Sequence, residues 1–335
     1  TGEIAQWLKA KQINAKGEAY LGKYYEHLGG EKMRTQDRLF ATLLEQRAGR
    51  GPCYLDVRGA DPRRLEGTIA AYLSMAPAAA MMLADEAYYA RSGGHMAPVE
   101  ICGGEPHVVG GHGLAGYWID AARRSTLPGL WAAGDVAGGS PKKYASGAWA
   151  EAAIAVRDMV ADVVGRPHVE LDEEDVVRER DRVMAPFEDK PEAVTPAELE
   201  ERLQKVMDEY AGGISVQYGC GEGELLVARI HLERLAAELG AMTVRSPYEL
   251  MHAHEVMDRV EVARVLVEHM LHRRETRWHC YHERLDYPER DDARWTVFVN
   301  TVKDPRTGEI RTLERPVERA DIPPPPPRTA PASGP

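Results

Sequence analysis

The chain has 335 residues, of which 44% are hydrophobic, and a formal net charge of -11. This length and hydrophobic content can build a substantial core and two or three domains. The negative charge and the lack of basic clusters exclude nucleic-acid binding. The longest apolar stretch, Met75–Ala84, contains Pro77 and is too short to cross a bilayer, so we exclude a transmembrane segment and expect a cytoplasmic protein.

The first segment in chain order covers residues 1–97 and is predicted to be rich in helices. A turn at residues 49–52 precedes the strand that we expect at Cys53–Val57. Helical spacing is present from the first residues onward, at Ile4, Ala5, Trp7, Leu8 and Ala10. We therefore expect the sequence to start partway through a helix.

The remaining segments differ in composition and in the spacing of their apolar residues. Residues 98–165 are rich in glycine and predict short strands followed by one long apolar helix. Residues 166–275 carry apolar residues at helical period, which predicts an antiparallel helical domain that opens with a solvated acidic helix start at 170–175. Residues 276–320 are an aromatic-rich extension, and the proline-rich end at 321–335 predicts an extended, disordered tail.

The chain has four cysteines, which lie far apart at Cys53, Cys102, Cys220 and Cys280. A cysteine-bound iron–sulfur cluster needs four thiolates at recurrent spacing, and these residues do not provide it. We interpret them as free thiols in a reducing cytosol. Electron transfer through a metal cluster would therefore belong to a partner protein.

Two histidine groups, His252 with His254 and His269 with His272, could suggest zinc. Neither follows the H-E-x-x-H pattern, so we interpret them as surface or interhelical histidines and expect no metal site. The C-terminal extension also concentrates aromatic residues, which we expect to pack in a core, with a partner-docking surface as the alternative. These are Trp278, Tyr281, Tyr287, Trp295 and Phe298.

The most informative stretch runs from Gly129 to Gly139 and reads G-L-W-A-A-G-D-V-A-G-G. It predicts a short buried strand at 130–133 that ends at Gly134, followed by Asp135 and a glycine-rich loop. Ligands of open α/β folds bind at the carboxyl ends of strands. Gly134 would let a ligand approach the backbone, and Asp135 is an acceptor suited to sugar or ribityl hydroxyls.

A helix of small residues is predicted after this loop, from about Ser146 to Val156. Its start offers unpaired N–H groups and the positive end of the helix dipole, both of which favour negative charge. Gly147 and Ala148 would permit the close approach of a ligand. The same residues also fit an ordinary strand–turn–helix whose glycines serve packing, and the residues alone leave that alternative open.

The Gly129–Gly139 stretch resembles the C-terminal flavin signature of the succinate dehydrogenase and fumarate reductase flavoproteins. Other segments are similar to the alpha subunits of adenylylsulfate reductases, and the resemblance covers nearly the whole chain. These segments are A-G-R-G-P-C-Y-L-D at 48–56, E-P-H-V-V-G-G-H at 105–112, E-T-R-W at 275–278, D-Y-P at 286–288, F-V-N at 298–300 and the turn D-P-R-T-G at 304–308.

The resemblance implies a mixed α+β and α/β fold with FAD as cofactor. Residues 1–97 would be the remainder of a capping domain, and 98–165 the C-terminal part of a Rossmann-like FAD-binding domain. The helical domain at 166–275 would follow, and then the extension at 276–320. A G-x-G-x-x-G diphosphate fingerprint is absent from residues 1–335.

The resemblance also implies roles for single residues. Asp135 matches the acidic residue that bonds the flavin ribityl chain, next to Gly134. Gly147 and Ala148, with Ser146 at the helix start, match the backbone positions that face the isoalloxazine edge. His112 matches the active-site histidine near the flavin, where the sulfur nucleotide docks, and its glycine neighbours fit an exposed loop.

The implied activity is the interconversion of adenylylsulfate with sulfite and AMP through a flavin–sulfite adduct. The small-molecule sulfur nucleotide would be the substrate, and an iron–sulfur beta subunit would exchange the electrons. One alternative is a fumarate-reductase-like flavoprotein, although Pro106 stands where those enzymes have a histidine. The other is a truncated, non-catalytic half that lacks the N-terminal FAD-binding motif.

Overall fold

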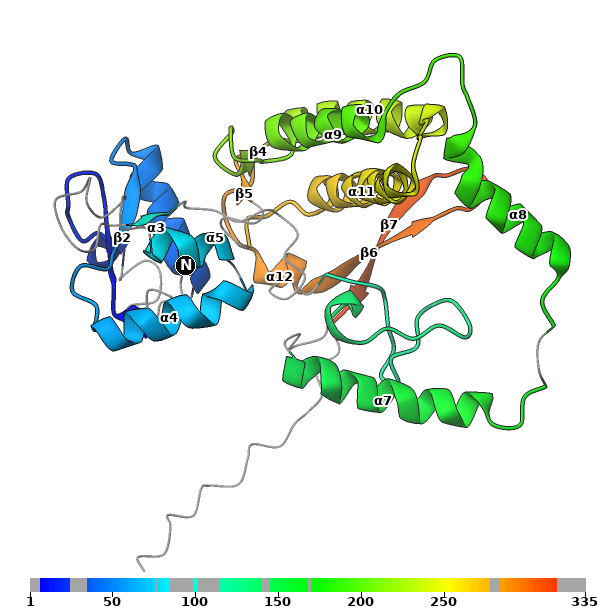
Figure 1. Cartoon of the computed structure of the whole chain (residues 1–335), viewed down its shortest axis with the longest axis horizontal. Coiled ribbons are helices and arrows are strands. Elements are labelled where there is room, and N and C mark those ends of the chain that lie inside the picture. The colour runs from blue at the N-terminus through cyan, green and yellow to red at the C-terminus, as the bar shows by residue number, and fades with distance from the viewer. Residues whose placement is uncertain are drawn as a thin grey trace, which may run out of the picture.

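The computed structural model of the chain describes residues 7–24, 35–75, 77–84, 99–101, 115–139, 145–167, 170–277 and 283–317. Within these ranges the chain has the predicted mixture of helices and small sheets (Figure 1). The described ranges leave out several residues and segments that the sequence singled out. These are Cys102, the segment 105–112 with His112, Trp278, Cys280, Tyr281 and the tail 321–335.

The first part of the chain surrounds a three-stranded antiparallel sheet of β1 (Lys11–Ile13), β2 (Cys53–Asp56) and β3 (Val99–Ile101). The strand expected at Cys53–Val57 is therefore confirmed as β2. A strand at β1 was not expected, and the initial helix ends before it. The reason is long-range: Gln12 and Ile13 are buried, and they pair with Leu55 and Tyr54 of β2.

Helical segments accompany this sheet in the described part of residues 1–101. They are η1 (Leu21–Tyr24), α3 (Thr35–Arg47), α4 (Pro62–Met75) and α5 (Pro77–Ala84). A buried polar network joins β1 to α3: Gln12 Nε2 donates to Thr42 Oγ1 at 3.1 Å, and Asn14 Nδ2 donates to Glu45 Oε2 at 2.9 Å. Because each of these buried polar groups has a partner, their removal from water is compensated.

Packed helices follow in the segment whose apolar period predicted them. Its elements are α8 (Glu173–Met184), η4 (Ala185–Phe187), α9 (Pro196–Tyr210), α10 (Glu222–Glu238), η5 (Leu239–Ala241) and α11 (Pro247–His272). The acidic run at 170–175 starts α8, where Asp172 caps Glu174 N at 2.9 Å and remains exposed. Thr195 and Ser246 cap α9 and α11, which explains why these helices begin where they do.

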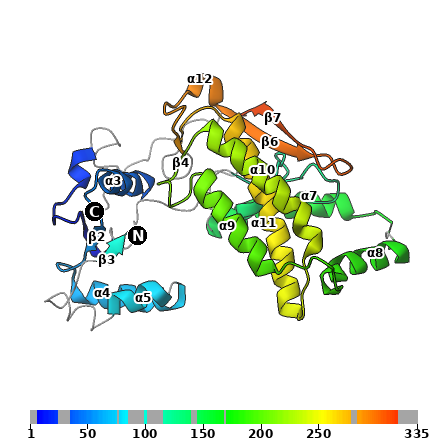
Figure 2. The same ribbon diagram turned by 90° about the horizontal axis from the view of Figure 1, so that it is seen from above.

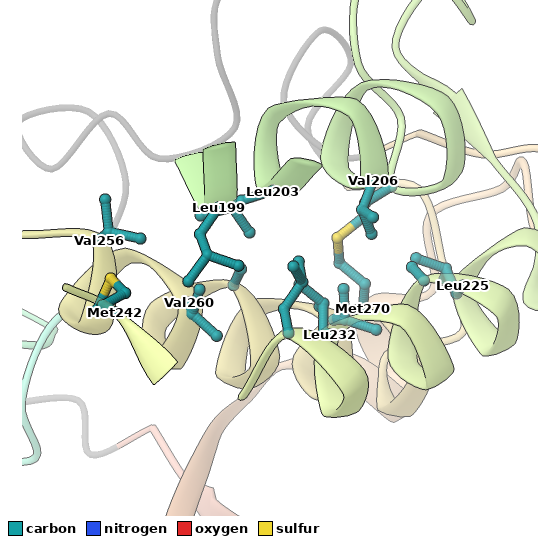
Figure 3. Packing of buried hydrophobic residues seen from close by; sticks show 14 of the residues in the cluster. Leu199, Leu203, Val206, Leu225, Leu232, Met242, Val256, Val260 and Met270 are labelled. Carbon is teal, nitrogen blue, oxygen red and sulfur yellow. The ribbon is translucent and has the colours of Figure 1, made fainter. Parts of the chain in front are cut away.

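The core of this part lies between α9, α10 and α11. Leu225, Ala228, Leu232 and Leu235 of α10 are buried at helical spacing, whereas Leu226 and Ile230 face outward. Figure 3 shows Leu199, Leu203 and Val206 of α9 meeting residues of α10 and α11. α8 lies apart from this core and contributes no buried residue (Figure 1).

The C-terminal part adds β5 (Glu283–Arg284), which pairs in parallel with β4 (Gly219–Cys220), and the short helix α12 (Asp292–Trp295). It ends in an antiparallel hairpin of β6 (Val297–Lys303) and β7 (Ile310–Pro316), which packs on α11. The expected turn at 304–308 closes this hairpin: Gly308 N donates to Asp304 O at 2.9 Å. No helix in the described part of the chain has the length and apolar content needed to cross a membrane.

Candidate functional site

The candidate site lies where residues 115–139 cross the start of α7 (Ala145–Val163), beneath the β6–β7 hairpin (Figures 1 and 2). Tyr117 and Ala137 form an isolated parallel bridge, in which Tyr117 N donates to Val136 O and Gly138 N donates to Tyr117 O, both at 2.8 Å. A Cβ on Gly116 would lie 2.6 Å from Gly138 N, and one on Gly138 would lie 2.7 Å from Gly116 O. Glycine is required at both positions because the two backbones touch.

The prediction of a buried strand at 130–133 is wrong. Only Trp131 makes a bridge, with Arg124, and Ala132 N donates to Arg123 O at 3.0 Å. Leu130 is 47% exposed. Within the described residues, the segment pairs with its own preceding loop and joins no larger sheet.

Gly134 is the first residue of the short helix η3 (Gly134–Val136), and it packs this loop against α7. Its φ of +74° lies in the left-handed region that favours glycine, and a Cβ there would lie 3.2 Å from the Cβ of Ala148. The structure thus brings Gly134 against the first turn of the helix that we expected to follow the loop. That helix begins at Ala145, one residue before the expected Ser146, and continues beyond the expected Val156 to Val163.

Polar side chains fasten the loop to α7, and the sequence reading did not identify them. Arg123 pairs with Glu151, which is buried in α7. Arg124 Nε lies 2.5 Å from Asp158 Oδ2, and Trp131 Nε1 donates to the same oxygen at 2.7 Å. The hydrogen bonds from Arg124 and Trp131 hold the pKa of Asp158 below its ordinary value. The sequence did contain a signal for these contacts, because the helical period of α7 places positions 151, 155, 158 and 162 on one face.

The first turn of α7 suits an anionic group that needs close contact with backbone. Ala145 and Ser146 are exposed, Gly147 and Ala148 are half-buried, and the turn carries no acidic side chain. The N–H groups at a helix start lack intrahelical partners and bear partial positive charge. These small residues, of which Ala148 packs against Gly134, fit the electron-rich edge of a reduced flavin.

Asp135 is exposed on η3, beside Gly134 and at the same end of α7. The structure therefore brings five predicted residues to one place: Gly134, Asp135, Ser146, Gly147 and Ala148. His112, the sixth, lies outside the described residues.

The remaining candidate histidines have protein partners. His252 Nε2 lies 2.9 Å from Glu200 Oε2, His254 Nε2 lies 2.9 Å from Val183 O, and His272 Nε2 lies 2.8 Å from Glu314 Oε1. Burial lowers the pKa of His269 to about 4. These contacts join separate elements, which confirms the interhelical and surface roles expected for the histidines.

Comparisons with known proteins show what this chain is similar to. The family model "Fumarate reductase flavoprotein C-term" matches residues 200–330. A solved quinol fumarate reductase of E. coli, with a TM-score of 0.72 and 17% identity over 96% of this chain and 56% of its own, shares the fold. Residues 200–330 of this chain are thus similar to the C-terminal part of fumarate reductase flavoproteins.

Over nearly its whole length, the chain is a homologue of the adenylylsulfate reductase alpha subunit, as the resemblance predicted. It is 27% identical to that subunit of Megalodesulfovibrio gigas over 94% of this chain and 56% of the relative. A solved adenosine-5-phosphosulfate reductase in complex with sulfite, described as a covalent adduct, has a TM-score of 0.78 and 28% identity over 94% of this chain and 57% of its own. The Archaeoglobus fulgidus adenylylsulfate reductase has a TM-score of 0.74 and 27% identity over the same shares. The chain therefore spans little more than half the length of these relatives.

Proposed function

We propose that this chain is part of a FAD-dependent oxidoreductase that interconverts adenylylsulfate with sulfite and AMP. The observation that carries the proposal is the packing of Gly134 against Ala148 at the start of α7. Among the described residues, the first turn of α7 is Ala145–Ala148, whose small side chains allow the close approach that a flavin site requires. The substrate is inferred from the two adenylylsulfate-reducing relatives, one of which holds sulfite as a covalent adduct.

Each candidate residue has a distinct task in this proposal. Asp135 would accept hydrogen bonds from ribityl hydroxyls, while the N–H groups of Ser146 and Gly147 would stabilise negative charge at the ring edge. The imidazole of His112 would donate to the sulfate oxygens of the substrate as the S–O bond breaks. FAD, when bound, supplies the two-electron chemistry of the interconversion.

The proposal assigns electron supply to an iron–sulfur beta subunit. In the described part of the chain the cysteines are Cys53 and Cys220, both free and buried. Burial raises the pKa of both thiols, to about 12 for Cys220, so neither is suited to bind metal as a thiolate. Free thiols also agree with a reducing, cytoplasmic setting. The domain division at residues 97, 165 and 275 belongs to the same proposal.

The test is to purify the flavoprotein that contains this chain together with its iron–sulfur partner. Wild type should release AMP and sulfite from adenylylsulfate with a reduced electron donor. His112→Ala should lower this turnover by about 10²–10³, the usual cost of one preorganised donor, while FAD content is unchanged. His112→Gln, which keeps a hydrogen-bond donor, should lose less.

Two outcomes would contradict the proposal. One is brisk reduction of fumarate without any AMP or sulfite from adenylylsulfate, which is the result expected of a fumarate-reductase-like enzyme. The other is a purified complex that has no flavin absorption, which is the result expected of a non-catalytic half.

A further inference from the structure

The β6–β7 hairpin contacts the glycine-rich loop of the candidate site directly, although the two are far apart in sequence. Gly139, the last glycine of the motif, has a φ of +78°. A Cβ at this position would lie 2.9 Å from Cζ and 3.1 Å from Cε1 of the Phe298 ring in β6. The loop backbone therefore rests on this ring without room for a side chain.

Arg315 of β7 connects both sides of the loop. Its guanidinium carbon lies 4.7 Å from the centroid of the Phe298 ring and 4.6 Å from that of Trp118. Such distances are within the range of cation–π attraction. Arg315 Nε also donates to Asn300 Oδ1 at 2.9 Å, which fixes the guanidinium relative to β6.

Trp118 follows Tyr117, the residue whose backbone bonds to Val136 and Gly138. The stack of Trp118, Arg315 and Phe298 therefore contacts the two strands of the loop that meet at Gly138. Below the site, Gly134 packs on α7, so the glycine-rich loop is held from two sides.

The hairpin is itself anchored to α11. Lys303 Nζ lies 2.8 Å from Glu261 Oε1, and Thr312 Oγ1 lies 3.0 Å from His272 Nδ1. The stack consequently links the glycine-rich loop to the core of the helical part.

We propose that Arg315 is a positioning residue for the candidate flavin site, which holds residues 134–139 in place through Phe298 and Trp118. This inference rests on the proposed function, because it assumes that these residues bind FAD. Without the stack, the loop would sample other conformations, and binding would have to include the cost of ordering it. The expected loss of affinity for FAD is about tenfold, which corresponds to about 1.4 kcal/mol.

The test compares Arg315→Ala, Arg315→Lys and Phe298→Leu with the matched control Arg311→Ala in the complete flavoprotein. Arg311 is an exposed residue of the same strand. Arg315→Ala should weaken FAD binding about tenfold and accelerate amide hydrogen exchange of residues 134–139 in the cofactor-free protein. Arg315→Lys, which keeps the cation, should restore most of the affinity, Phe298→Leu should resemble Arg315→Ala, and Arg311→Ala should behave as wild type.

The two readouts separate the two proposals. If wild type binds no FAD but Arg315→Ala still accelerates exchange at 134–139, the proposed function fails and the link between hairpin and loop stands. If Arg315→Ala lowers only the melting temperature, with FAD affinity and loop exchange as in wild type, Arg315 is merely structural and this inference is overturned. Should Arg315→Ala not fold, an unchanged affinity and loop exchange in Phe298→Leu would overturn it equally.

Discussion

Arg50 binds the fully buried carboxylate of Glu45 through two nitrogens: Nε lies 2.8 Å from Oε2, and Nη2 lies 2.9 Å from Oε1. Tyr24 OH donates to the same carboxylate at 2.7 Å. Glu45 thereby ties α3 to the turn that precedes β2 and to η1. A charge in such a position depends on its partners, since the protein interior cannot replace them.

Removal of Arg50 should therefore destabilise this part of the chain strongly. Arg50→Ala is expected to cost about 3 kcal/mol, because it removes both guanidinium hydrogen bonds of a buried carboxylate and leaves, among the described residues, only Lys23 Nζ, 3.6 Å from Oε1, as a cationic partner. The matched control is Arg58→Ala, which breaks the exposed Arg58–Asp56 pair and should cost about 0–1 kcal/mol. Urea unfolding followed by circular dichroism measures both. Equal losses in the two variants would show that burial of Glu45 does not matter.

The same carboxylate should make stability depend on pH. Hydrogen bonds from Arg50, Asn14 and Tyr24 lower the pKa of Glu45 from 4.5 to about 2. A lowered pKa in the folded state contributes stability above the ordinary pKa, and this stability is lost as the pH falls toward the folded value. The free energy of unfolding should thus contain a component that declines between about pH 4.5 and 2. Glu45→Gln should lack that component, and parallel pH curves for the two proteins would refute it.

The contact between Gly134 and Ala148 gives a prediction with an internal control. Gly134→Ala and Gly129→Ala both place a side chain at positive φ, which costs about 1–2 kcal/mol. Only the Cβ at Gly134 meets another residue, whereas nothing lies within 4 Å at Gly129. Gly134→Ala should therefore be the more destabilising of the two. Adding Ala148→Gly should recover part of the difference despite its own helix cost of about 1 kcal/mol. Additive losses in the double variant would mean that the two residues do not interact.

Asp135 should affect FAD binding more than stability. A hydrogen bond to a charged group contributes about 1.5–3 kcal/mol, so Asp135→Ala should lower FAD affinity about ten- to a hundredfold in the complete flavoprotein. Flavin occupancy after gel filtration and isothermal titration measure this change. Asp181→Ala, which removes the same charge from exposed α8, is the control. Equal flavin retention in both variants would show that Asp135 does not contribute to FAD binding.

Much of the fold could be predicted because its causes are local. The apolar residues of 166–275 recur with the period of a helix, and their burial in α9, α10 and α11 follows from that repeat. The β2 strand and the turn of the β6–β7 hairpin were likewise visible in residues 53–57 and 304–308. By contrast, β1 was missed because three residues form a strand only when a distant partner is available.

For the candidate site, the sequence by itself determined where glycine, carboxylate and helix start follow one another, since these are neighbours along the chain. The role of His112 and the domain limits stay predictions. Only the tertiary structure decided that 130–133 would pair locally, that Arg123 and Arg124 would fasten the loop to α7, and that Phe298 would support Gly139. The physical reason is that such contacts depend on which surfaces meet after the chain has folded, and no short pattern encodes that meeting.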